Sequence, residues 1–130
     1  MTREEFEALI CDRYGITADY PFEDDLSTAV FRHMRNRKWF AVVMNIKRQR
    51  IGLEGDGNID VVNLKCDPEV IYSLADQEAG LYRAYHMNKT HWITAALDGT
   101  CADGTLEWLL GISHSLTAPK IKPQKKKNAD

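Results

Sequence analysis

The sequence has little of what marks membrane proteins, secreted proteins or disulfide scaffolds. Its 130 residues contain no apolar run near the ~20 residues that a helix needs to cross a bilayer. The first residues are acidic and amphipathic, unlike the apolar core of a signal peptide. Cys11, Cys66 and Cys101 are odd in number and form no Cys-x-x-Cys pair, which disfavours a zinc knuckle. We therefore expect a soluble cytoplasmic protein with reduced cysteines.

Signatures of common enzyme classes are also missing. The chain has no Gly-x-Ser-x-Gly, no P-loop, no dinucleotide fingerprint and no His-Glu-x-x-His. Cys66 precedes an expected helix start, where the helix dipole could lower the pKa of a thiol, but no base is fixed beside it. A packed, structural cysteine is the favoured interpretation. We expect no enzyme activity and no cofactor.

Basic charge is scarce outside the C-terminal tail. The chain has a net charge of −2, with 17 basic and 19 acidic side chains. Residues 120–130 hold five lysines and one aspartate, so the rest keeps 12 basic and 18 acidic side chains. A protein body with a net negative charge does not attract nucleic acid through its overall electrostatic field. Binding would require a local basic surface or the tail, 119–130, which we expect to be disordered.

What the sequence does contain is a clear order of helices and strands. Thr2 and Glu5 make a capping-box pattern at the start of a helix. Asp67 and Pro68 suit the start of a second helix. The predicted helices cover 3–14, 68–78 and 104–117. Extended runs joined by short turns predict five antiparallel strands at 29–34, 38–46, 59–66, 81–86 and 91–97.

The predicted fold is α+β, in the order α-β-β-β-α-β-β-α, with a single domain over residues 1–118. Hairpins make the sheet antiparallel, and the three amphipathic helices can cover one of its faces. The expected core comprises Phe6, Leu9, Ile10, Phe40, Val42, Val62, Leu64, Ile71, Leu74, Trp92, Leu106, Leu109 and Leu110.

Two segments are more specific than these patterns: Asn63-Leu64-Lys65-Cys66-Asp67-Pro68, and Tyr85–Thr94 with the Leu97-Asp98-Gly99 that follows. They resemble the MmcQ/YjbR family of small bacterial proteins, and the resemblance covers nearly all of residues 1–118. It implies an antiparallel sheet backed by helices, similar to the CyaY (frataxin-like) architecture, and a DNA-binding label given by analogy of shape. The matching motif residues are Lys65, Cys66, Asp67, Pro68, His86, Asn88, Lys89, His91 and Trp92.

Two acid-free stretches are candidates for binding nucleic acid. Residues 32–50 contain seven basic residues, and residues 83–91 add two more. If the hairpin ends meet, they form a positive face for phosphates, with Trp39 able to stack on a base. We hypothesise a weak, sequence-tolerant contact with nucleic acid, DNA included. The alternative is a protein-interaction or small-ligand module with no nucleic-acid role. The contact residues would be Arg35, Arg37, Lys38, Lys47, Arg48, Arg83 and Lys89.

Metal binding is the weaker hypothesis. His86 and His91 could converge on a metal, but a stable zinc site takes four ligands, and others would have to come from Cys66, Asp67 or His33. The favoured interpretation is that this motif shapes a hairpin, with Asn88 in the turn, Trp92 in the core and the His91 side chain bonded to a loop carbonyl. Acidic residues could attract hard cations, as the acidic ridge of frataxin-like proteins does, although a solvated face is favoured. They are Glu4, Glu5, Glu7, Asp12, Asp19, Glu23, Asp24 and Asp25.

Overall fold

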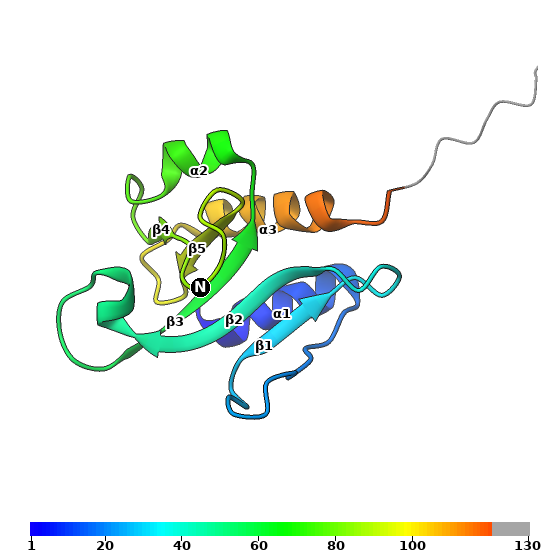
Figure 1. Cartoon of the computed structure of the whole chain (residues 1–130), viewed down its shortest axis with the longest axis horizontal. Coiled ribbons are helices and arrows are strands. Elements are labelled where there is room, and N and C mark those ends of the chain that lie inside the picture. The colour runs from blue at the N-terminus through cyan, green and yellow to red at the C-terminus, as the bar shows by residue number, and fades with distance from the viewer. Residues whose placement is uncertain (121–130) are drawn as a thin grey trace, which may run out of the picture.

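The expected elements form one antiparallel sheet with three α-helices in the computed structural model, which describes residues 1–120. The strands lie in the order β1-β2-β3-β5-β4. Figure 1 shows α1 and α3 behind the sheet and α2 beside the end of β3. This confirms the predicted α+β fold. The bounds are α1 Arg3–Tyr14, β1 Ala29–Arg32, β2 Trp39–Lys47, the 3-10 turn η1 Arg48–Ile51, β3 Asn58–Lys65, α2 Pro68–Leu74, β4 Leu81–Arg83, β5 Trp92–Ala96 and α3 Asp103–Thr117.

The first helix begins as its capping residues predict. The Thr2 hydroxyl accepts a hydrogen bond from the Glu5 amide, and the Glu5 carboxylate accepts one from the Thr2 amide at 2.8 Å. Both halves of the capping box are therefore present. Gly15 ends the helix in the left-handed region, at φ 67°. At the start of α2, Asp67 holds the N-cap position, but its side chain makes no capping bond.

Helix α2 is shorter than predicted, because it ends at Leu74 rather than at residue 78. Ala75 leaves the helical conformation, and Asp76 takes a φ of 62°. The Asp76 amide then donates to the Leu81 carbonyl at 2.9 Å. The predicted last turn of the helix does not form, because the Asp76 amide bonds to the first residue of β4 instead. Helical periodicity in the sequence does not reveal such a tertiary contact.

Two strands end at least two residues earlier than predicted. β1 stops at Arg32 and β4 at Arg83, two and three residues short of the predicted ends. At β1 the cause is the following turn, in which the His33 amide donates to the Lys38 carbonyl and the Arg37 amide donates to the His33 carbonyl.

Both faces of the sheet are covered, whereas the sequence predicts cover on one face. On the helical face, Phe6 and Ile10 of α1 and Leu109 of α3 are fully buried in one large cluster. On the opposite face, which we call the open face, Val42 and Met44 belong to a second apolar cluster. The side chains packed against that second cluster come from loops and strands rather than from the α-helices. β2 and β3 are therefore buried on both sides.

Most of the predicted core residues lie in these two clusters. Leu9 and Leu74 are only partly buried against the helical cluster. Trp92 is half-buried and belongs to neither cluster, so its prediction as a core residue is wrong. It is the first residue of β5, paired with Lys65 at the end of the sheet, where few elements can cover it.

The hydroxyl of Ser113 joins α3 to the ends of the two central strands. The β2–β3 pairing runs up to Ala41 opposite Leu64, so Phe40 and Lys65 would form the next pair. There, Ser113 donates to the Phe40 carbonyl at 2.5 Å and accepts from the Lys65 amide at 2.8 Å. One buried hydroxyl thus replaces a rung of the ladder and satisfies two backbone groups.

Within residues 1–120, none of the helices has the length and apolar character that crossing a bilayer requires. Most of the tail predicted over 119–130 lies outside the described residues.

We predict that Ser113→Ala destabilises the protein by about 1–3 kcal/mol, because it leaves the Phe40 carbonyl and the Lys65 amide without their partner. Urea unfolding followed by circular dichroism measures the change. Ser115→Ala is the matched control, because Ser115 lies on the same helix but is exposed. Equal stability of the two variants would contradict the role given to the Ser113 hydroxyl.

Candidate nucleic-acid interface

The family-motif segment between β4 and β5 is folded on itself by Asn88. Its side-chain oxygen accepts hydrogen bonds from the amides of Thr90 at 2.8 Å and His91 at 3.2 Å, and its carbonyl accepts one from the Trp92 amide at 3.0 Å. The Lys89 ammonium donates to the Ala84 carbonyl at 2.9 Å, which ties the two sides of the segment together. The motif therefore gives this segment a defined shape and presents it on the sheet.

The surroundings of Cys66, the motif cysteine, favour a structural role. The Cys66 amide donates to the His91 carbonyl at 2.9 Å, and the thiol is buried. Burial raises the pKa of the Cys66 thiol to about 11, which opposes a thiolate at neutral pH. The side chains of His86 and His91 are exposed, and no hydrogen bond from the His91 ring to a loop carbonyl is found within residues 1–120.

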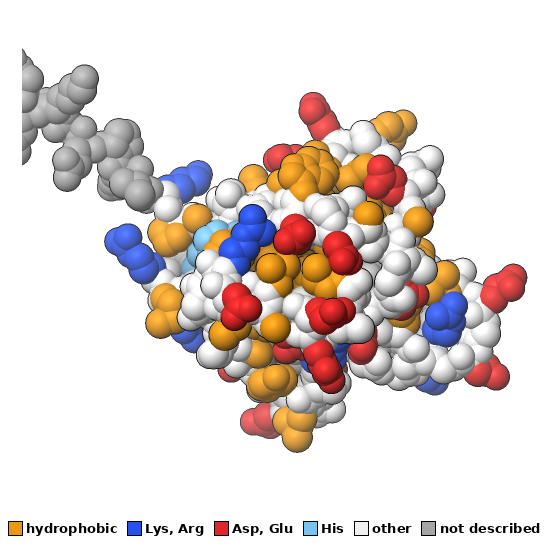
Figure 2. Space-filling model, turned by 180° about the vertical axis from the view of Figure 1, so that it is seen from behind, with side chains coloured by type: hydrophobic (Ala, Val, Ile, Leu, Met, Phe, Trp, Pro, Cys, Tyr) orange, Lys and Arg blue, Asp and Glu red, His pale blue; other side chains and the backbone are white. Residues whose placement is uncertain are grey.

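The acidic residues predicted on the first helix lie on the helical face, where Figure 2 shows Asp and Glu side chains spread over the surface. Two of them are engaged locally: Glu7 pairs with Arg3 at 2.6 Å, and Glu5 completes the helix cap. No group of three or more His, Cys, Asp or Glu side chains among residues 1–120 is arranged to hold a metal ion.

The first predicted basic group, Arg35, Arg37 and Lys38, lies exposed in the β1–β2 turn. The turn is attached to the end of α3, because the side-chain amide of Asn36 donates to the Thr117 carbonyl at 2.9 Å. Figure 2 shows Lys and Arg side chains at this end of the molecule, beside the point where the tail begins. The three cations are thus held together on a rigid turn.

The acid-free run over residues 32–50 does not form one surface. β2 has nine residues and spans about 30 Å at ~3.3 Å per residue, so it separates Lys38 from Lys47 and Arg48. Arg48 is engaged in its own loop, where its Nε donates to the Glu54 carbonyl at 2.9 Å. Arg32 pairs with Asp19 at 2.7 Å. The number of charges along the sequence does not reveal this separation, because residues at the two ends of a strand lie at opposite ends of the sheet.

A different set of basic residues does converge. Arg83 of β4 and Lys89 of the motif segment line two neighbouring hollows of about 340 and 330 Å³. Arg50 of η1 lines the second hollow, and Asp76 lines both. We call Arg50, Arg83 and Lys89 the basic ridge. None of the ion pairs within residues 1–120 involves these three cations, and the ammonium of Lys89 is bonded to the neutral Ala84 carbonyl, which leaves its charge unpaired.

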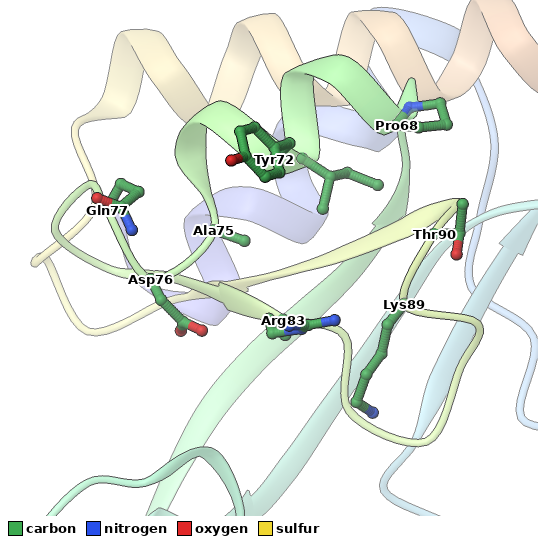
Figure 3. Close-up of a pocket in the computed structure, with 9 residues that line it drawn as sticks. Pro68, Tyr72, Ala75, Asp76, Gln77, Arg83, Lys89 and Thr90 are labelled. Atoms are coloured by element: carbon green, nitrogen blue, oxygen red, sulfur yellow. The ribbon is translucent and has the colours of Figure 1, made fainter.

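Tyrosines lie on both sides of the basic ridge. Figure 3 shows the hollow beneath α2, with Tyr72 on the helix and Arg83 and Lys89 across from it. Tyr72 is 88% exposed, which is unusual for so large a side chain. Tyr82 and Tyr85 line the second hollow. These tyrosines are not among the contact residues predicted from the sequence, although Tyr72 lies outside the apolar stripe of its helix and this position predicts an exposed aromatic ring.

Comparison with known proteins places these observations in a family. The model of the YjbR family matches residues 12–116. The chain is 38% identical over 117 residues to the uncharacterised protein YyaQ of Bacillus subtilis, across 90% of this chain and 98% of that protein. It is 31% identical over 70 residues to the uncharacterised protein YjbR of Escherichia coli K12, across 54% and 59%. A crystal structure of a protein from Pseudomonas syringae superposes with a TM-score of 0.88 at 41% identity, covering 91% of this chain and all of that one.

The β1–β2 turn is also held by a pair of histidines. The Nε2 atom of buried His33 lies 3.0 Å from the His114 carbonyl and 2.9 Å from the Thr117 hydroxyl, which itself donates to the Ser113 carbonyl at 2.7 Å. His33 Nε2 therefore carries a proton and donates to both. Burial lowers the pKa values of His33 and His114, and for His114 the neighbouring His33 and Arg13 lower it further.

We predict that these histidines make the protein less stable in mild acid. A histidine with a lowered folded-state pKa contributes stability above its ordinary pKa of about 6.5, and this contribution is lost as the pH falls through the folded-state value. The midpoint of thermal unfolding should therefore fall between about pH 7.5 and 5.5. The double variant His33→Gln/His114→Phe should flatten that dependence, whereas His86→Gln, at an exposed position, should not. An unchanged slope in the double variant would refute the assignment.

Proposed function

The chain belongs to the YjbR family, and we propose that it is a non-catalytic protein that binds single-stranded nucleic acid weakly through the basic ridge. Arginine and lysine contact the phosphates, and tyrosine rings accept bases by stacking, so the binding carries little sequence preference. The proposal keeps Arg83 and Lys89 from the sequence-based hypothesis and adds Arg50 and the neighbouring tyrosines.

Arg83 and Lys89 line both hollows, and each hollow is also lined by at least one tyrosine. This arrangement is the main support for the proposal. A flexible strand crossing the ridge meets cations in the middle and an aromatic ring on either side. This alternation suits a single strand, whose bases are free to turn toward aromatic rings. A duplex has its bases stacked internally and gains nothing from the tyrosines.

Local charge favours the ridge over the rest of the body. Three cations surround the hollows, and Asp76 offsets one of them. The remaining body carries an excess of acid, so its long-range field does not help. Binding should therefore be weak and strongly dependent on salt.

We predict a dissociation constant of roughly 10⁻⁴ to 10⁻⁶ M for a fluorescein-labelled oligothymidylate at physiological salt, measured by fluorescence anisotropy. The double variant Arg83→Gln/Lys89→Gln should bind more weakly and should flatten the log–log salt dependence by about 0.7 for each phosphate that the variant no longer neutralises. Arg35→Gln/Arg37→Gln is the matched control, because it removes the same charge from an exposed turn. Thermal melting verifies that both variants are folded.

Three results would refute the proposal. Absence of binding at low salt would favour the alternative of an interaction or small-ligand module. Equal weakening in both double variants would indicate a response to net charge alone. Complete loss of binding on replacing the five tail lysines with glutamine would show that the tail acts as a general polycation.

We also predict that Tyr72→Ala weakens binding of the oligothymidylate by about tenfold, because stacking of one base on an aromatic ring contributes ~1–3 kcal/mol. Tyr72 is 88% exposed, so its truncation should leave the fold intact. Trp108→Ala is the control, because Trp108 is also an exposed aromatic residue, on α3 and away from the ridge. Equal affinity for Tyr72→Ala and the native protein would exclude stacking at this position.

A further inference from the structure

The open face of the sheet contains a cavity that the basic ridge does not use. It measures about 490 Å³, within the size range of small-molecule sites. Val42 and Met44 of β2 form part of its apolar lining, and the loop before β1 and the motif segment contribute Phe22 and Met87. The cavity thus lies where loops rather than helices cover the second apolar cluster.

Aromatic rings make up much of the lining. Phe22 and Trp39 meet edge to face, with ring centroids 5.9 Å apart and planes at 90°, and Tyr85 is the third ring. The chain already sets one cation against Trp39: the guanidinium carbon of Arg32 lies 5.6 Å from the centre of that ring and is paired with Asp19. Arg32 is not part of the cavity lining, so the lining itself contains no arginine or lysine.

The charged groups of the lining are two carboxylates, Asp24 and Asp25, with His86 as the single basic side chain. Asp25 accepts hydrogen bonds from the Thr28 hydroxyl at 2.5 Å and the Ser27 hydroxyl at 2.8 Å, and these bonds lower the pKa of its carboxyl. Asp24 is exposed and makes no hydrogen bond or ion pair within residues 1–120. The rim is therefore negative at neutral pH and has one carboxylate free.

The side chain of Asn63, in the cavity lining, already has hydrogen-bond partners within the protein. The fully buried side chain of Asn63 donates to the Tyr85 carbonyl at 2.7 Å and accepts from the Thr94 hydroxyl at 2.5 Å. The Thr94 hydroxyl in turn accepts from the Tyr85 amide at 2.9 Å. This network holds the Tyr85 segment on the sheet and engages the side chains of Asn63 and Thr94 within the protein.

From aromatic walls, an acidic rim and a lining without arginine or lysine, we propose that this cavity binds an organic cation, an ammonium group carried on an apolar body. The apolar body fills the space over Val42 and Met44, and the ammonium group lies against the rings beside Asp24. Aromatic faces attract cations through their quadrupole, and a nearby carboxylate adds to the attraction. The proposal does not rest on nucleic-acid binding: the cavity shares Tyr85 and His86 with the second hollow, but its charged rim is acidic rather than basic.

The test compares three probes that share a phenyl ring: phenethyltrimethylammonium, neutral 2-phenylethanol and anionic 3-phenylpropionate. Two-dimensional ¹H–¹⁵N NMR of the full chain follows the titration through the indole signals. Saturable shifts of the Trp39 indole are expected with the cation at millimolar concentration, while Trp92 and Trp108 stay unmoved as internal references. The neutral probe should bind more weakly, and the anion should not bind.

Trp39→Leu should weaken binding of the cation by roughly 3- to 30-fold, the range for a cation–π contact, whereas Trp108→Leu should have no effect. Because Trp39→Leu has no indole signal at this position, affinities are compared through the backbone amide signals of Met44 and Met87, which also line the cavity. Asp24→Asn, at an exposed position with no risk to the fold, should weaken binding most at low salt. The spectra themselves verify folding. The proposal is overturned by equal binding of the anion, by unchanged affinity in both Trp39→Leu and Asp24→Asn, or by the absence of saturable shifts at Trp39.

Discussion

The buried hydroxyl of Ser113 is the contact on which the arrangement of the sheet and its last helix depends. It accepts from β3 and donates to β2 at the place where those strands stop pairing with each other. The same helix holds the β1–β2 turn through Thr117. Helix α3 therefore fixes both the end of the β2–β3 pairing and the β1–β2 turn that leads into β2.

Burial of the sheet on both faces explains how two surfaces of opposite charge coexist on a small protein. The helices occupy one face with their own core, so the loops are free to cover the other. Where those loops meet β4, cations gather around tyrosines. Where they meet β2, carboxylates rim an aromatic cavity. The two regions share Tyr85 and His86 of the motif segment, which places the most family-specific part of the chain between them.

Features set by neighbours in the sequence were predictable, and features set by distant contacts were not. The Thr2–Glu5 cap and the five strand runs follow from local chemistry, and the family resemblance supports them. The early end of α2 depends on a bond from Asp76 to β4, which no local pattern reveals. The convergence of Arg50 with Arg83 requires a loop to fold back over the open face, so proximity in sequence gave the wrong grouping of charges. The sequence of β2 gave a partial indication of the open-face cavity, because its apolar residues point to both faces of the sheet and both faces therefore need cover.

The late position of Ser113 in the chain affects how the protein can assemble during synthesis. Lys65 leaves the ribosome 48 residues before Ser113, and Phe40 leaves 73 residues before it. Until α3 is made, the central strands lack both their bridging hydroxyl and the part of the core that Leu106, Leu109 and Leu110 supply. A nascent chain that lacks α3 therefore exposes apolar surface, a feature that favours aggregation. We therefore expect the sheet to reach its final packing only after α3 has been synthesised.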